Sequence, residues 1–96
     1  MSAEPAALLD ELADQLVARG LVEQGDFYIT GRFPTQVPSS EHIGMRHRDG
    51  LYVVWYRDLG DSRTLEESAD FATARDRFVR EAVTLARERG RRVSDV

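Results

Sequence analysis

The segment 42–58 constrains the fold more than any other part of the chain, because two runs of alternating side chains flank Asp49 and Gly50. An Asp-Gly pair readily adopts the two left-handed conformations of a type I′ turn, and this turn joins the strands of a tight β-hairpin. A two-residue loop also fixes the register of the two strands. The pattern therefore predicts an antiparallel pair in which Gly44 lies opposite Trp55.

The predicted register divides the side chains of the hairpin between two faces, since residues directly opposite each other share a face. The more apolar face, which should join the core, consists of Ile43, Met45, His47, Tyr52, Val54 and Tyr56. The other face carries His42, Gly44, Arg46, Arg48, Leu51, Val53, Trp55 and Arg57. Arginines around a tryptophan are unusual on a surface that contacts only water and are typical of protein interfaces.

Apolar residues at three- and four-residue spacing predict one helix near each end of the chain. The first helix should begin around Pro5 and end at Gly20. Its apolar stripe consists of Leu8, Leu9, Leu12, Leu16 and Val17. The second helix should span about Ala74–Arg89, with Thr73 and Asp76 as a capping box. Its inward residues are Phe78, Val79, Ala82, Leu85 and Ala86.

Two further segments have patterns that fit strands. Phe27–Phe33 alternates, with Tyr28 and Arg32 on the side that extends the arginine- and tryptophan-bearing face of the hairpin. Residues 34–40 contain two prolines and two serines and predict a connecting loop. Residues 63–67 fit either a short fourth strand or an irregular approach to the last helix.

Together these elements predict an α+β fold with the order α-β-β-β-(β)-α. Its antiparallel sheet of three or four strands should be covered on one face by the N- and C-terminal helices. The 96 residues support a single domain, which we place at residues 1–90, followed by a flexible C-terminal tail at 91–96. No element is predicted to cover the opposite face of the sheet. This face should carry Tyr28, Arg32, Arg46, Trp55 and Arg57.

Composition argues against several classes of protein. The chain has no cysteine, which excludes a disulfide framework, a thiol nucleophile and a cysteine metal site. No apolar run approaches the roughly 18–20 residues of a membrane span and no basic-then-apolar leader opens the sequence, so we expect a cytoplasmic protein without membrane contact. The net charge is −4, with acids concentrated in residues 1–31 and 58–74. This balance argues against a nucleic-acid partner and favours a protein partner.

The sequence shows no arrangement suited to catalysis. His42 and His47 lie five residues apart on one strand, hence on opposite faces, and cannot share a metal ion. Ser39 and Ser40 precede His42, but no nucleophile elbow is present, and the glycines are scattered singly instead of forming a phosphate-binding loop. Paired carboxylates lack a pocket that would desolvate them. We therefore predict no enzyme, no metal site and no cofactor.

The C-terminal half contains a sequence pattern that also occurs in a known family. The pattern consists of an aromatic-aliphatic strand, then an arginine and a glycine, and then a phenylalanine that leads into a helix. The residues that carry this pattern are Tyr52, Val54, Tyr56, Arg57, Gly60, Phe71, Phe78 and Ala82. Residues 52–83 thereby resemble the small immunity proteins of bacterial polymorphic toxin systems. The resemblance implies a small, cytoplasmic, non-catalytic protein that binds a cognate toxin domain and occludes its active site.

Two interface models follow for such a protein. In the first, the toxin meets the uncovered sheet face through Tyr28, Arg32, Arg46, Trp55 and Arg57. In the second, it meets an acidic turn and strand, whose charge would accelerate encounter with a basic, nuclease-like toxin. The acids of that second model are Asp58, Asp61, Glu66 and Glu67. The sheet face could instead be buried in a homodimer. The alternative function is a small secretion chaperone or regulatory adaptor that binds a client protein through the same face.

Overall fold

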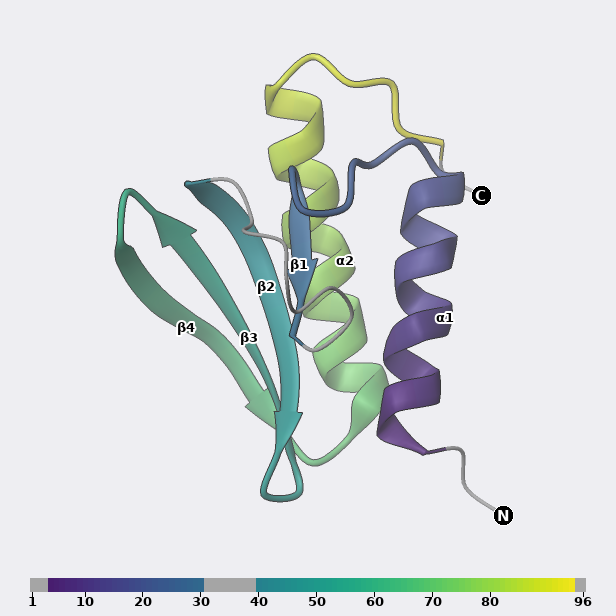
Figure 1. Cartoon of the computed structure of the whole chain (residues 1–96), viewed down its shortest axis with the longest axis vertical. Coiled ribbons are helices and arrows are strands. Elements are labelled where there is room, and N and C mark those ends of the chain that lie inside the picture. The colour runs from purple at the N-terminus through teal and green to yellow at the C-terminus, as the bar shows by residue number, and fades with distance from the viewer. Residues whose placement is uncertain (1–3, 31–39, 95–96) are drawn as a thin grey trace.

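A computed structural model of the chain describes residues 4–30 and 40–94, and these residues form an α+β fold of two helices and a four-stranded sheet (Figure 1). The elements are α1 (Pro5–Ala18), β1 (Phe27–Ile29), β2 (Glu41–Arg48), β3 (Leu51–Asp58), β4 (Asp61–Ser68) and α2 (Phe71–Glu88). The strands lie in the sheet in chain order, and both helices lie on one side of it (Figure 1). The predicted fold class is therefore confirmed.

The central hairpin has the predicted turn and the predicted register. Asp49 and Gly50 have φ angles of 55° and 80°, both in the left-handed region that a type I′ turn requires. All the predicted pairs are present, from Arg48 opposite Leu51 at the turn to His42 opposite Arg57 at the far end. One dipeptide therefore specified how two eight-residue strands meet.

The pairing of β1 with β2 corrects the expected all-antiparallel sheet, because these two strands run parallel, with Tyr28 beside Gly44. Residues 30–40 separate the two strands, and a connection of this length can return the chain to the same end of the sheet, which a tight turn cannot. Strand β1 ends at Ile29, earlier than the predicted 27–33. Arg32 and most of the predicted loop at 34–40 lie outside the described residues.

Residues 63–67, for which the sequence left two interpretations, lie within strand β4. Leu59 and Gly60, with φ angles of 50° and 91°, form a second tight turn between β3 and β4. The register shifts along this pair, since Val54 lies opposite Glu66 while Trp55 lies opposite Thr64. The extra residue of this bulge is Leu65, which packs against the core.

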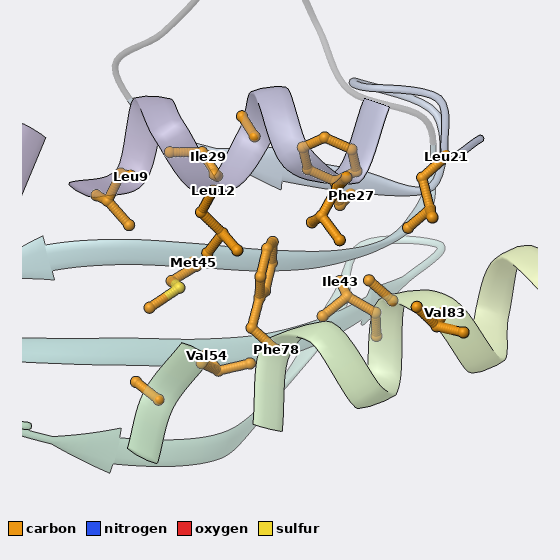
Figure 2. Packing of buried hydrophobic residues seen from close by; sticks show 14 of the residues in the cluster. Leu9, Leu12, Leu21, Phe27, Ile29, Ile43, Met45, Val54, Phe78 and Val83 are labelled. Atoms are coloured by element: carbon orange, nitrogen blue, oxygen red, sulfur yellow. The ribbon is translucent and has the colours of Figure 1, made fainter. Parts of the chain in front are cut away.

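The core lies between the sheet and the two helices (Figure 2). Phe78 of α2 meets Phe27 of β1 edge to face, with ring centroids 6.1 Å apart. The buried sheet residues on this side include Ile43, Met45, Tyr52 and Val54, as the register predicted. The buried stripe of α1 is shifted from the predicted one, because Val17 is 49% exposed whereas Ala13, which was not predicted, is buried. We call this side of the sheet the helix-side face.

Helix α2 begins three residues before the predicted start. The carboxylate of Asp70 accepts hydrogen bonds from the backbone N–H of Thr73 at 3.1 Å and from its hydroxyl at 2.7 Å. Asp70 is thus the N-cap, and Thr73 lies in the first turn instead of capping it. The predicted capping box of Thr73 and Asp76 is therefore wrong. The hydrogen bonds from Thr73 also hold the pKa of the Asp70 carboxyl below its ordinary value.

Residues 91–94, which were expected to belong to a flexible tail, contact the end of α1. The backbone N–H of Ser94 donates to the carbonyl of Arg19 at 2.9 Å, and Arg19 Nε donates back to the carbonyl of Ser94 at 2.6 Å. Val93 packs against the core. Neither helix, over the part of the chain that the structure describes, has the length and apolar character needed to cross a membrane.

Candidate functional site

A groove of about 910 Å³ runs along the sheet face that points away from the helices. We call it the outer groove. It is lined by Tyr28, Thr30, Ser40, His42, Arg46, Val53, Trp55, Arg57, Leu59, Gly60, Ser62 and Thr64. Side chains alternate along each strand, so the burial of Met45 and Val54 on the helix-side face turns Arg46, Val53 and Trp55 outward. The sequence pattern of the hairpin thus creates both the core and the groove.

The strand registers arrange the groove in rows that cross the sheet. The middle row contains Tyr28, Gly44, Trp55 and Thr64, one residue from each strand from β1 to β4. On one side of it, Arg46 lies opposite Val53, and on the other side His42 lies opposite Arg57. Arg46 and Arg57 therefore lie on opposite sides of the middle row, which we call the tryptophan row.

Trp55 lies across β2, directly on Gly44. A Cβ atom added to Gly44 would lie 2.0 Å from Cε2 of the indole, so any other residue at this position would displace the ring. Tyr28 and His42 also contact the ring edge to face: their centroids lie 6.3 Å and 6.5 Å from that of Trp55, and 5.6 Å from each other. These edge-to-face contacts give the partly exposed indole a fixed position.

The cations of the groove have no carboxylate partner nearby. The guanidinium of Arg46 lies 5.8 Å from the centroid of the Trp55 ring, in a cation–π contact. Arg57 is exposed, and neither Arg46 nor Arg57 forms an ion pair with any residue in 4–30 or 40–94. None of the described groove-lining residues is an aspartate or glutamate. The groove is therefore aromatic in the middle and positive towards both ends.

The structure brings together four of the five residues of the first interface model, namely Tyr28, Arg46, Trp55 and Arg57. The fifth, Arg32, lies outside the described residues. Sequence reasoning placed His42 on this face but left it out of the interface residues, whereas the structure shows it lining the groove and only 3% exposed. Its position opposite Arg57, one row from Trp55, was already contained in the predicted register and could have identified it.

The acids of the second interface model are divided between the two faces of the sheet. Glu66 lies opposite the buried Val54, on the helix-side face, whereas Glu67 lies opposite Val53, on the groove face. Asp58 and Asp61 lie opposite each other beside the β3–β4 turn. By the alternation of side chains along β3, they are on the same helix-side face as Glu66. The four carboxylates thus do not form one continuous surface.

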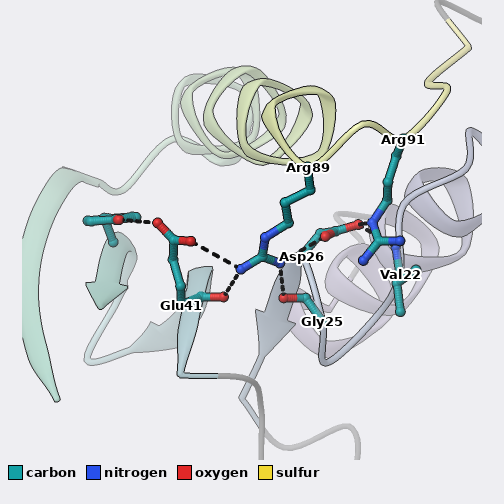
Figure 3. Close-up of polar contacts among 7 residues, drawn as sticks. Val22, Gly25, Asp26, Glu41, Arg89 and Arg91 are labelled. Atoms are coloured by element: carbon teal, nitrogen blue, oxygen red, sulfur yellow. Dashed lines mark hydrogen bonds and ion pairs between the residues drawn. The ribbon is translucent and has the colours of Figure 1, made fainter. Parts of the chain in front are cut away.

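A second group of charged residues lies where the end of α2 meets the start of β1 and β2 (Figure 3). The carboxylate of Asp26 is fully buried, with Arg89 Nη1 at 2.9 Å from one oxygen and Arg91 Nε at 2.5 Å from the other. The backbone N–H of Val22 also donates to this carboxylate at 2.9 Å. Burial raises the pKa of Asp26, but the hydrogen bonds from Arg91, Val22 and Arg89 more than offset it, so the pKa lies below the ordinary value.

The same group extends to the sheet through Glu41. Arg89 Nη2 donates to the Glu41 carbonyl at 2.7 Å and lies 3.3 Å from its carboxylate, whose other oxygen accepts a hydrogen bond from the hydroxyl of Tyr56 (Figure 3). This hydrogen bond, with a smaller effect of desolvation, raises the pKa of Tyr56 to about 12. We call Asp26, Glu41, Tyr56, Arg89 and Arg91 the Asp26 cluster.

The two histidines lie on opposite faces of the sheet, as predicted. His42 lies beside the outer groove, while His47 stacks on Tyr52 with a centroid distance of 4.5 Å. Within residues 4–30 and 40–94, no group of three or more histidine, aspartate or glutamate side chains is placed to hold a metal ion.

No protein-family model, curated protein or solved structure matches this chain. The outer groove and the residues that line it are therefore the features from which a function can be inferred.

Proposed function

We propose that the protein is a non-catalytic binding module that binds a partner protein through the outer groove. The observation that carries this proposal is the placement of Trp55, fixed over Gly44 and set between two arginines that lack a carboxylate partner among the described residues. Tryptophan, tyrosine and arginine supply most of the residues that dominate the free energy of protein–protein binding. The groove presents all three.

The geometry also favours tight binding because the aromatic side chains are already ordered. Binding costs free energy when it immobilises side chains, by about 0.5–1.5 kcal/mol for each flexible one. Trp55 is held by Tyr28, His42 and the Gly44 backbone before any partner arrives. A partner would therefore meet a prearranged surface.

More specifically, we propose a toxin-neutralising immunity protein of a bacterial polymorphic toxin system, acting in the cytoplasm on a cognate toxin domain. The resemblance over residues 52–83 supports this class, and strand β3 within that segment supplies Val53, Trp55 and Arg57 to the groove. In this role the protein would cover the active site of the toxin, which needs a binding face and no chemistry of its own. A secretion chaperone or regulatory adaptor would use the same groove and is distinguished by experiment.

We expect the gene to lie directly downstream of one that encodes a large secreted protein with a variable C-terminal toxin domain, and the test is co-expression with that domain. The wild-type protein should restore growth, and Trp55→Ala should abolish this protection while the protein stays folded by circular dichroism. Val17→Ala, a change at an exposed apolar residue of α1, is the matched control and should protect fully.

Failure of the wild-type protein to protect, although it is produced, would reject the immunity proposal. A client that becomes more soluble but stays toxic would instead indicate the chaperone function. Full protection by Trp55→Ala would reject the outer groove as the binding face.

A further inference from the structure

The cations of the outer groove lie at a defined spacing. Arg46 is two residues along β2 from Gly44, and Arg57 is two residues along β3 from Trp55, in the opposite direction. At about 3.3 Å per residue, the two arginine rows are roughly 13 Å apart along the strands. Between them lies the tryptophan row.

Both guanidinium groups are available to an incoming anion. Several arginines elsewhere in the described residues do have carboxylate partners: Arg77 pairs with Glu81 at 3.1 Å and Arg89 with Asp26 at 2.9 Å. Arg46 and Arg57 have no such carboxylate within the described parts of the chain. A guanidinium can bind a carboxylate through two parallel hydrogen bonds, so each arginine suits an aspartate or glutamate of the partner.

We infer that the outer groove takes an extended acidic segment of the partner protein, with two carboxylates four residues apart and an apolar residue midway between them. Residues i, i+2 and i+4 of an extended segment point to one side and span the same roughly 13 Å as the two arginine rows. The first and last of them would pair with Arg46 and Arg57, and the middle one would lie on Trp55. This inference rests on the proposed function. It concerns only the segment that is bound in the groove and not the net charge of the whole partner.

The surroundings of the groove favour a short acidic segment over a nucleic acid strand. Glu67 lies on the groove face, opposite Val53 and in the same row as Arg46. A peptide segment needs only two anionic groups, one at each arginine row, whereas a nucleic acid strand carries a phosphate at every nucleotide and would bring further negative charge close to Glu67. The net charge of −4 also repels a long polyanion.

The test uses Trp55, the only tryptophan of the chain, as a fluorescent reporter of groove binding. The probe is a blocked seven-residue peptide of serines, with glutamate at its second and sixth residues and leucine at its fourth. Its twin has glutamine in place of both glutamates, and a seven-nucleotide oligothymidylate is the competing ligand. The acidic peptide should bind at least about tenfold more tightly than its twin, corresponding to about 1.4 kcal/mol.

Arg46→Gln and Arg57→Gln should each remove most of this preference for the acidic peptide. Arg80→Gln is the matched control, since Arg80 is an exposed arginine of α2, in the helix layer. Equal binding of the two peptides, or tighter binding of oligothymidylate than of the acidic peptide, would overturn the inference.

The outcome for the proposed function is read separately, from toxin protection. If Trp55→Ala abolishes protection while the two peptides bind equally, the groove binds a partner but not through an acidic segment. If Trp55→Ala protects fully, the groove is not the binding face, whatever the peptides show.

Discussion

The outer groove and the Asp26 cluster each contain two arginines, yet the structure uses these residues in different ways. In the Asp26 cluster, Arg89 and Arg91 share a fully buried carboxylate, and their side chains are only 25% and 35% exposed. In the outer groove, Arg46 and Arg57 are exposed and have no carboxylate partner in residues 4–30 or 40–94. The comparison indicates that the first pair holds the fold together and the second is available to a partner.

The largest effect on stability should come from Asp26→Asn, because it leaves two arginines facing each other without the carboxylate between them. Removing one member of a buried ion pair typically costs 3–5 kcal/mol, and the partial exposure of both arginines reduces this to about 2–4 kcal/mol. Urea unfolding measures the change. Asp61→Asn, at an exposed carboxylate of β4, is the control and should stay within about 0.5 kcal/mol. A loss below about 1 kcal/mol for Asp26→Asn would contradict a structural role for the cluster.

In the groove, Gly44→Ala should have an intermediate effect, since its Cβ would overlap the indole of Trp55. Overpacking of this kind costs about 1–3 kcal/mol, and the displaced ring should change its fluorescence emission. In a Trp55→Ala background, the same Gly44→Ala change should cost almost nothing, because the clash has been removed. Additive losses in the double variant would show that Gly44 is needed for another reason.

The smallest effect should be a change in stability at alkaline pH, caused by Tyr56 at the sheet end of the Asp26 cluster. Its folded-state pKa of about 12 lies above the ordinary value of 10.0, so the protonated hydroxyl is favoured by folding. This contribution to stability is fully present below pH 10 and is lost as the pH rises towards 12. Ultraviolet titration should place the phenol near 12 and Glu41→Gln should return it towards 10. A titration of Tyr56 near 10 in the wild type would contradict the Glu41 hydrogen bond.

The parts of the groove that could be predicted from sequence are those controlled by local geometry. Asp49 and Gly50 fix the turn, the turn fixes the register, and the register places Trp55 on Gly44 and between the rows of Arg46 and Arg57. The same alternation separated the core side chains from those of the groove. The two residues of the turn were sufficient because side chains alternate between the faces with a period of two, so that a fixed register assigns every side chain of both strands to a face.

The Asp26 cluster could not be predicted in the same way, because its members come from distant parts of the chain. Asp26 and Arg89 are 63 residues apart, and no local pattern indicates that they meet. The parallel direction of β1 likewise depends on how a long connection returns to the sheet. The true N-cap, Asp70, was missed because Thr73 also fits a capping position, and packing of Phe71 on Tyr52, at a centroid distance of 5.2 Å, favours the earlier start.

The central claim is that the outer groove binds a partner while the Asp26 cluster stabilises the fold, and a matched pair of variants tests it most directly. Arg57→Gln and Arg89→Gln make the same chemical change in the two regions, and for each the free energy of unfolding and the protection against the toxin domain are measured together. We predict that Arg57→Gln weakens protection with stability unchanged within about 0.5 kcal/mol, and that Arg89→Gln lowers stability by about 1–3 kcal/mol. Full protection by Arg57→Gln, or an equal loss of stability in both variants, would contradict the account.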